Sequence, residues 1–478
     1  MRQSAEYDRL LDVNRRSYAL DALRGFAILT MILSGIIPFG VLPSWMYHAQ
    51  VPPPSHVFNP NLPGITWVDL VFPFFLFAMG AAIPLALAKR IEQGAPYWKI
   101  VSQVLVRGLL LGGFAIYIEH VRPYTLNPEP NRETWLLSLL GFVLLFPIFM
   151  RLPNSWRPWI RLVVKVIGWG GAIAFMAMVR YPDGSRFSLD RSDIIIKVLA
   201  NVAVFGSLIW LATQRNWLLR LGTIGVYLAI LLSSSYAGWV QIIFNKSPIP
   251  WLFRMDYLRY LFIVIPGTIA GDMICTWMKS AKSEDAGKWP AWRFAFITVL
   301  MFGFVAVILV GLKARLLIET TLVGSAMCLL AWWLVCRPRN ETEKLIRDLV
   351  AWGIFWLVLG LAFEPYEGGI KKDHATMSYY FVTCGLAIFM LIAFTIIIDV
   401  FKKKRPLQLL IDNGQNPMIA YAGVSNFILP VLALTNLSLV LQRLTPTPWL
   451  GFLRGLFETI LMALVVSFFT RRKVFWRT

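Results

Sequence analysis

The sequence is short of charged residues. Only 15% of its 478 residues are Asp, Glu, Lys or Arg, whereas soluble globular proteins carry about a quarter. This shortage excludes an ordinary water-soluble domain, and 57% of the residues are hydrophobic. Apolar runs of about 18 or more residues recur along the chain, and each can cross a ~30 Å hydrocarbon core. We therefore predict an all-α, polytopic bundle of transmembrane helices with about 11–14 spans.

Cysteine and histidine are also scarce, with four of each. The cysteines fall in or beside apolar runs without paired spacing, which argues against a disulfide framework and a zinc site. No two histidines have the spacing of metal ligands on a helix. We therefore expect no metal cofactor.

Lys and Arg are absent from residues 26–88, although the chain holds 46 of them. Short connections that would share one side with both termini hold 29, and the opposite connections hold 14. This bias predicts that both termini are cytoplasmic. We expect a cytoplasmic segment at 1–18, a single membrane domain at 19–470 with a non-cytoplasmic loop at 38–64, and a cytoplasmic tail at 471–478. The net charge of +20 then reflects topology and contact with membrane lipid, and we expect no nucleic-acid partner.

The loop at 38–64 carries His48 and His56 and leads into an apolar run that begins near Asp69. Thr66 and Asp69 have the positions of a helix N-terminal cap. Asp69 can also orient and charge a nearby imidazole, and the two roles are compatible. A second loop of interest, EPYEGGIKKDHATM, occupies residues 364–377.

Asp21 and Arg24 are ionisable residues at the start of the first apolar run. They are three positions apart, so they share one helical face. One interpretation is an ion pair at the helix end, with Arg24 reaching lipid phosphate. The other is that Arg24 faces the bundle and holds a phosphate of a cytoplasmic ligand, which suits its planar, permanently charged group.

Two later segments combine polar groups with helix-breaking residues. In PGTIAGD, Pro266 and two glycines precede Asp272, and they predict a break or kink in that span. In DNGQNPMIAYAG, Asn416 precedes a proline at the membrane edge. Each segment is a candidate ligand site or a place where helices pack closely.

Six segments resemble the family of the heparan-α-glucosaminide N-acetyltransferases and their bacterial relatives. They are LDALRGFAILTMI (20–32), MYHA (46–49), GITWVDLVFPFFLFAMGAA (64–82), RYLFIVIPGTIAGD (259–272), GGIKKDHATMSYYFVTCGLA (368–387) and GQNPMIAYA (414–422). The segment around DLVFPFFLF is the most specific. The sequence departs from the family where Ser34 replaces a usual Asn, and where Ala375 replaces a usual Trp.

The resemblance implies a transmembrane acetyltransferase that takes acetyl-CoA from the cytoplasm and acetylates an amine or hydroxyl of a sugar on the far side. His48 corresponds to the family's functional histidine, and we expect Asp69 to tune it. The candidate acetyl-CoA residues are Asp21, Arg24, Asp272 and Asn416, and the candidate acceptor residues are His56, Lys371, Lys372 and His374. The expected location is a bacterial inner membrane, with the protein acting as a monomer or homodimer.

Two other classes of function compete with an enzyme. A transporter or flippase for a sugar or lipid-linked anion would also have broken helices and buried charges. We find no clear internal repeat, which disfavours a carrier. A non-catalytic membrane scaffold would need neither the ionisable residues in the spans nor the histidine loop.

We predict that the loop carrying His48 is outside the cytoplasm. A cysteine in place of Ser55 should therefore react with an impermeant thiol reagent added to intact cells. The unsubstituted chain serves as the background. Labelling only after the membrane has been opened would reverse the predicted topology.

Overall fold

The computed structural model describes residues 16–153, 155–214, 216–280 and 288–478, and these form helices joined by loops. Thirteen helices in these ranges are long and apolar enough to cross a membrane. A further apolar helix, α9 (Trp217–Ser233), is shorter. The predicted all-α polytopic bundle is confirmed. Most of the expected segment at 1–18 lies outside the described residues.

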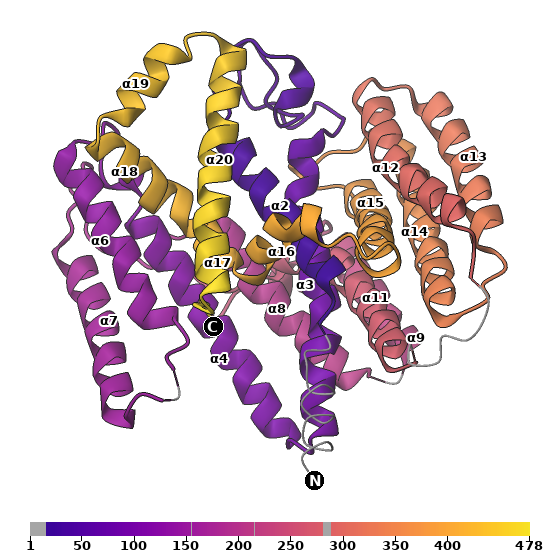
Figure 1. Ribbon diagram of the computed structural model, residues 1–478, viewed down its shortest axis with the longest axis horizontal. Helices are drawn as coiled ribbons and strands as arrows, with labels where there is room; N and C mark the ends of the chain where they lie inside the picture. Colours follow the sequence, from indigo (N-terminus) through magenta and orange to yellow (C-terminus); the bar gives the residue numbers. More distant parts are fainter. Residues whose placement is uncertain (1–15, 154, 215, 281–287) are drawn as a thin grey trace.

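The centre of the bundle consists of helices from both ends of the chain (Figure 1). They are α2 (Tyr18–Ile36), α3 (Trp67–Glu92), α11 (Leu261–Ser280), α15 (Met377–Thr395) and α16 (Gln408–Gln415). α3 packs against α2, α11 and α15, and α16 packs against α2. Long apolar stretches in α3 and α15 predict this placement, because a helix that is apolar all round is buried.

Two groups of helices flank this centre (Figure 1). One comprises α4 (Tyr97–His120), α6 (Arg132–Phe149), α7 (Pro158–Met178) and α18 (Leu429–Leu434). The other comprises α12 (Ala291–Lys313), α13 (Leu317–Val335) and α14 (Glu341–Tyr366). α8 (Ile194–Ala212) lies between α4 and the centre. α20 (Pro448–Arg471) packs against α2 and α16, and α17 (Pro417–Gly423) packs against α2 and α20.

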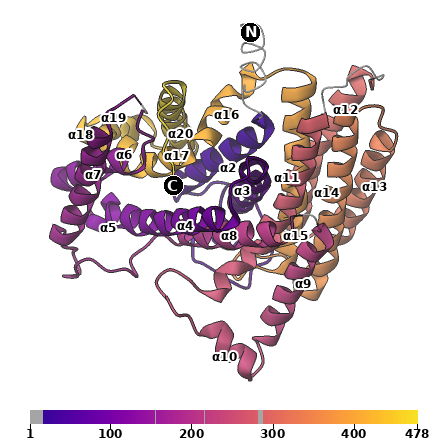
Figure 2. The same ribbon diagram turned by 90° about the horizontal axis from the view of Figure 1, so that it is seen from below.

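Shorter helices complete the described chain. They are η1 (Ser44–Met46), α5 (Pro123–Leu126), α10 (Trp239–Asn245), η2 (Met255–Tyr260), η3 (Ile396–Val400), η4 (Arg405–Leu407), η5 (Val424–Ile428) and α19 (Leu437–Leu444). Viewed from below, α10 lies at the outer edge of the molecule and α4 runs beside α8 (Figure 2).

The expected break in the segment PGTIAGD is absent, because α11 is one helix that includes Pro266. The glycines of this segment serve close packing instead. A Cβ on Gly267 would lie 2.5 Å from the Phe77 carbonyl oxygen, and one on Gly271 would lie 2.3 Å from that of Ala81. Gly80 of α3 approaches the Val264 carbonyl in the same way. We call this backbone-to-backbone contact between α3 and α11 the glycine seam.

The other expected discontinuity is present, since α16 ends at Gln415 and α17 begins at Pro417. Asn416 lies between them and is fully buried. Proline at the first helical position restarts the helix in a new direction, because it needs no backbone hydrogen-bond acceptor.

We predict that Gly271→Ala lowers the thermal unfolding midpoint of the protein in detergent. The added methyl group overpacks the glycine seam, which typically costs about 1–3 kcal/mol. Gly225→Ala in α9 is the matched control, because nothing lies within 4 Å of a Cβ there. Alanine at an open helical site is favourable by about 1 kcal/mol. An equal or higher midpoint for Gly271→Ala would show that the seam yields easily.

Candidate functional site

The loop at 38–64 folds back onto the N-terminus of α3. The Tyr47 hydroxyl donates to the carbonyl of Pro38 at 3.1 Å, and the Thr66 hydroxyl donates to the carbonyl of Tyr47 at 2.7 Å. Met46 and Tyr47, which belong to this loop, are themselves buried. These contacts hold the next residue, His48, beside the first turn of α3.

Asp69 is fully buried and contributes both of its carboxylate oxygens to this arrangement. Oδ2 accepts hydrogen bonds from the backbone N–H of Thr66 at 2.9 Å and of Ala49 at 3.2 Å. Oδ1 lies 3.4 Å from Nδ1 of His48. The helix-cap role and the imidazole role expected of Asp69 are thus divided between its two oxygens.

The opposite side of the His48 ring faces Asp373, which lies in the loop between α14 and α15. His48 Nε2 is 2.9 Å from Asp373 Oδ2. The hydrogen bond from His48, ahead of the charges of Lys372 and His48, lowers the pKa of the Asp373 carboxyl. Because a lowered carboxyl pKa preserves the ionised form, this contact persists through neutral pH and is lost only in acid, as the pH falls through that lowered pKa.

Gln50 joins the two loops. Its buried side-chain oxygen accepts from the Asp373 backbone N–H at 2.8 Å, and its amide nitrogen donates to the carbonyls of Asp373 and of Pro60, the latter at 3.0 Å. Its backbone N–H donates to His48 Nδ1 at 3.0 Å. One side chain thereby fixes the position of Asp373 relative to His48.

The candidate acceptor residues are distributed around this centre. Lys372 Nζ lies 3.8 Å from Asp69 Oδ1, and His374 is exposed next to Asp373. The Lys371 backbone N–H lies 3.1 Å from the Thr376 hydroxyl, and the Lys371 carbonyl accepts from the Thr376 backbone N–H at 3.1 Å. His56 packs edge-on against the rings of Phe39 and Tyr47, with Nε2 3.3 Å from the Gly40 carbonyl.

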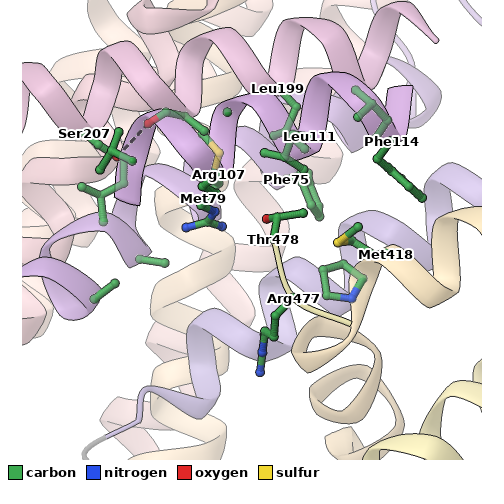
Figure 3. A pocket seen from close by; sticks show the side chains of 18 of the residues that line it. Phe75, Met79, Arg107, Leu111, Phe114, Leu199, Ser207, Met418, Arg477 and Thr478 are labelled. Atoms are coloured by element: carbon green, nitrogen blue, oxygen red, sulfur yellow. Dashed lines mark hydrogen bonds between the residues drawn. The ribbon is translucent and has the colours of Figure 1, made fainter. Parts of the chain in front are cut away.

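A cavity of about 680 Å³ lies beside α3 and is bounded by α2, α4, α8, α17 and the end of the chain (Figure 3). Its walls are largely apolar. Four of its lining residues are arginines, namely Arg24, Arg90, Arg107 and Arg477, and the described residues that line it include no Asp or Glu. Such a surface suits a ligand with a negatively charged part and a long, less polar part.

The cavity extends along α3 from Arg90 to Phe72. These residues are about 27 Å apart at 1.5 Å per helical residue, which is close to the ~30 Å thickness of a hydrocarbon core. Asp69 lies about one helical turn beyond Phe72, just past this end of the cavity. The same helix therefore has an arginine at one end of the cavity and supports the His48 site near the other end.

Arg24 faces this cavity. Its Nη1 donates to the Gly414 carbonyl at 3.2 Å and its Nη2 to the Ala78 carbonyl at 3.4 Å. Asp21 lies 3.6 Å from Arg24 and also pairs with Arg16. A guanidinium has five N–H donors, so Arg24 keeps others for a ligand.

Arg477, next to the last residue of the sequence, also lines the cavity (Figure 3). Asn416 holds this tail in place, donating to the Val474 carbonyl at 2.8 Å and accepting from the Trp476 N–H at 3.2 Å. Removal from water, and then the like charges of Arg16, Arg24 and Arg107, lower the pKa of Arg477 to about 10. Arg477 stays charged at neutral pH, so the neighbouring guanidinium groups repel one another.

Asp272 does not line the cavity. It accepts from Arg220 at 2.6 Å and from the indole N–H of Trp210 at 3.0 Å. Arg220 is fully buried, so Asp272 supplies the counter-charge that a buried guanidinium requires.

Sequence reasoning missed Gln50, Arg107, Asp373 and Arg477. Arg107 had a detectable signal, since an arginine within an apolar span marks a functional position. Asp373 lies between Lys372 and His374, which were both expected to contact the acceptor. Among the described residues, no group of three His, Cys, Asp or Glu side chains could hold a metal ion.

Comparison with known proteins identifies a family. The profile described as "Domain of unknown function (DUF5009)" matches residues 16–274, more than half of the chain. This chain belongs to the DUF5009 family. The matched region of this DUF5009 protein contains His48, Asp69 and the two arginines Arg24 and Arg107.

A human protein, heparan-alpha-glucosaminide N-acetyltransferase, is 30% identical over 138 residues. The match covers 28% of the DUF5009 chain and 18% of the human protein. A distant relative of the chain is thus an N-acetyltransferase, which agrees with the resemblance that the sequence motifs indicate.

Proposed function

We propose that this DUF5009 protein is a transmembrane acyltransferase that moves an acetyl group from acetyl-CoA to an amine or hydroxyl of a sugar. The observation that carries the proposal is the relation between two sites on α3. His48, which contacts the buried Asp69, lies at one end, and the arginine-lined cavity runs along the same helix from the other. The Arg90 end is the cytoplasmic one, as the distribution of Lys and Arg predicts.

The cavity supplies the features that acetyl-CoA requires. Phosphate groups are held by guanidinium groups, which present paired N–H donors in a planar fork. Arg24, Arg107 and Arg477 provide three such groups around one space. The apolar walls that continue toward Phe72 can receive the long arm that ends in the thioester.

His48 performs the proton transfers. The imidazole takes the proton from the attacking N–H or O–H of the acceptor as the new C–N or C–O bond forms. The thioester C–S bond breaks, and the same imidazole returns the proton to the departing sulfur. The products are the acetylated acceptor and CoA with its free thiol. In the variant route, His48 first carries the acetyl group itself.

Asp69 holds the ring during these steps. A carboxylate beside Nδ1 stabilises the imidazolium that forms when Nε2 accepts a proton, and it fixes the orientation of the ring. Its burial removes competing water, so the interaction is stronger than at a surface.

The decisive experiment uses purified protein in lipid nanodiscs with radiolabelled acetyl-CoA and a panel of amino sugars and neutral sugars. Appearance of label on a sugar supports the proposal. A transporter or flippase would instead move intact sugar or lipid-linked anion across proteoliposomes without labelling it. Transport without acetylation on any acceptor would overturn the acyltransferase assignment.

We predict that His48→Ala abolishes acetyl transfer while acetyl-CoA binding stays within about twofold of wild type. Loss of a general base costs about 10²–10⁴-fold, and a larger loss with intact folding favours the acetyl-histidine route. Asp69→Asn should retain more activity than His48→Ala, because the base remains and only its partner is weakened.

His56→Ala is the matched control for His48→Ala, since both histidines lie in the same loop. Its activity should remain near wild type, because His56 packs between aromatic rings on the outer side. If His56→Ala is inactive and His48→Ala is active, the wrong histidine has been chosen.

We predict that Arg24→Lys weakens acetyl-CoA binding about tenfold. Lysine keeps the charge but loses the paired donors, and hydrogen bonds to charged groups contribute about 1.5–3 kcal/mol. Calorimetric titration of acetyl-CoA measures the change, and Arg186→Lys on the exposed surface is the control. Unchanged affinity in a folded Arg24→Lys protein would make Arg24 a structural residue only.

A further inference from the structure

The hydrogen bonds around His48 determine which ring nitrogen carries the proton in the neutral ring. The Gln50 backbone N–H donates to Nδ1 at 3.0 Å, so Nδ1 is an acceptor. Asp373 lies 2.9 Å from Nε2, and an ionised carboxylate can only accept. The proton therefore resides on Nε2, pointing at Asp373.

This arrangement is unsuited to catalysis as it stands. A base or nucleophile must present an unprotonated nitrogen to the reacting group, and Nε2 is both protonated and covered. The nitrogen with the free lone pair, Nδ1, faces the Gln50 amide and the buried side of the site. Something must release Nε2 before His48 can act.

We propose that Asp373 is a positioning residue that holds His48 in the resting Nε2–H form, and that the acceptor releases it by taking its place on the Asp373 carboxylate. The second part rests on the proposed function, because it identifies the acceptor as the displacing group. The N–H or O–H that is to be acetylated makes its first contact with Asp373, directly beside Nε2.

Asp69 offers the alternative position for the proton. Its Oδ1 has no hydrogen-bond partner among the described residues, although it is fully buried and lies 3.4 Å from Nδ1. A buried carboxylate oxygen without a donor is costly. When Nε2 gives up its proton to solvent and Nδ1 takes one up, the Gln50 N–H loses its acceptor, Asp69 Oδ1 gains the donor that it lacks, and Nε2 becomes free.

Asp373 can yield without rearrangement of the loop. Gln50 fixes the backbone N–H and C=O of Asp373, so the main chain stays in place. The side chain itself is 47% exposed, whereas the Asp69 side chain is 0% exposed. Rotation about its two side-chain bonds turns the carboxylate from the imidazole to an arriving ligand.

The remaining charges around Asp373 favour this exchange. Lys372 and His374 flank it in its own loop, and Tyr260 of η2 and Tyr379 of α15 lie near enough to interact with its charge. Among the described ion pairs the Asp373 carboxylate has His48 as its partner, and Lys372 instead lies 3.8 Å from Asp69. The carboxylate can therefore exchange His48 for a ligand donor without breaking another such contact.

The first test reads the tautomer directly and does not depend on catalysis. The protein is labelled with ring-¹⁵N histidine and examined by NMR at about pH 8, where an ordinary imidazole is neutral. The four histidines are assigned by single substitution. We expect His48 in the Nε2–H form in the wild type, and a shift toward Nδ1–H in Asp373→Ala.

Asp190→Asn, an exposed carboxylate in another loop, is the matched control and should leave the His48 signal unchanged. A wild-type ring that is already Nδ1–H, or an Asp373→Ala spectrum identical to wild type, would overturn the proposal. A spectrum that shows loss of folding in Asp373→Ala is replaced by that of Asp373→Leu, which also has no acceptor for Nε2–H and for which the same shift is required.

The second test concerns the acceptor. With the best acceptor from the sugar panel, Asp373→Asn should raise the acceptor KM about tenfold or more, because a charge-assisted hydrogen bond is lost. Acetyl-CoA affinity should stay within about twofold of wild type. An unchanged acceptor KM would overturn the acceptor part. If the wild type acetylates nothing, the proposed function and the acceptor part fail together, while the NMR result still decides the tautomer.

Discussion

The buried carboxylate of Asp69 is the interaction on which the site depends. A charge removed from water must be compensated by hydrogen bonds and counter-charges, or the fold does not tolerate it. Here the compensation comes from Thr66 and Ala49 through one oxygen and from the charge of Lys372 through the other, which also lies 3.4 Å from His48 Nδ1. Those partners belong to segments separated by some three hundred residues. The need to satisfy one carboxylate thus brings the loop at 38–64 and the loop before α15 to the same point.

The far end of α3 presents the opposite electrostatic problem. Arg24, Arg107 and Arg477 approach one cavity, and Asp21 is the acid that influences Arg477 there. Guanidinium groups that face one another are tolerated when a bound anion completes the arrangement. Two carboxylates, Asp69 and Asp373, thus face His48 near one end of α3, and three arginines share a cavity that extends to the other end of the helix.

The sequence predicted much of the fold, because hydropathy reports membrane burial directly. Of the break or kink predicted at Pro266 the break is absent, because α11 continues through the proline, and the glycines beside it serve the close approach of α3. In the site, chain proximity predicted the meeting of His48 and Asp69 correctly. Asp373 was missed since no local pattern links residues 48 and 373. Arg477 was missed because hydropathy does not reveal that a polar tail turns back into the bundle.

The glycine seam has a mechanical consequence. Where backbones touch without intervening side chains, no rotamer change can absorb a displacement, so α3 and α11 must move as one body. The cavity lies on another side of α3, against α4 and α8, where side chains such as Leu111, Leu199 and Met79 form the walls. Those side chains can change rotamer, whereas the backbones of the seam cannot, so adjustment to a ligand falls to the walls of the cavity and not to the seam. The seam thereby fixes the helix that carries Asp69, whatever the cavity holds.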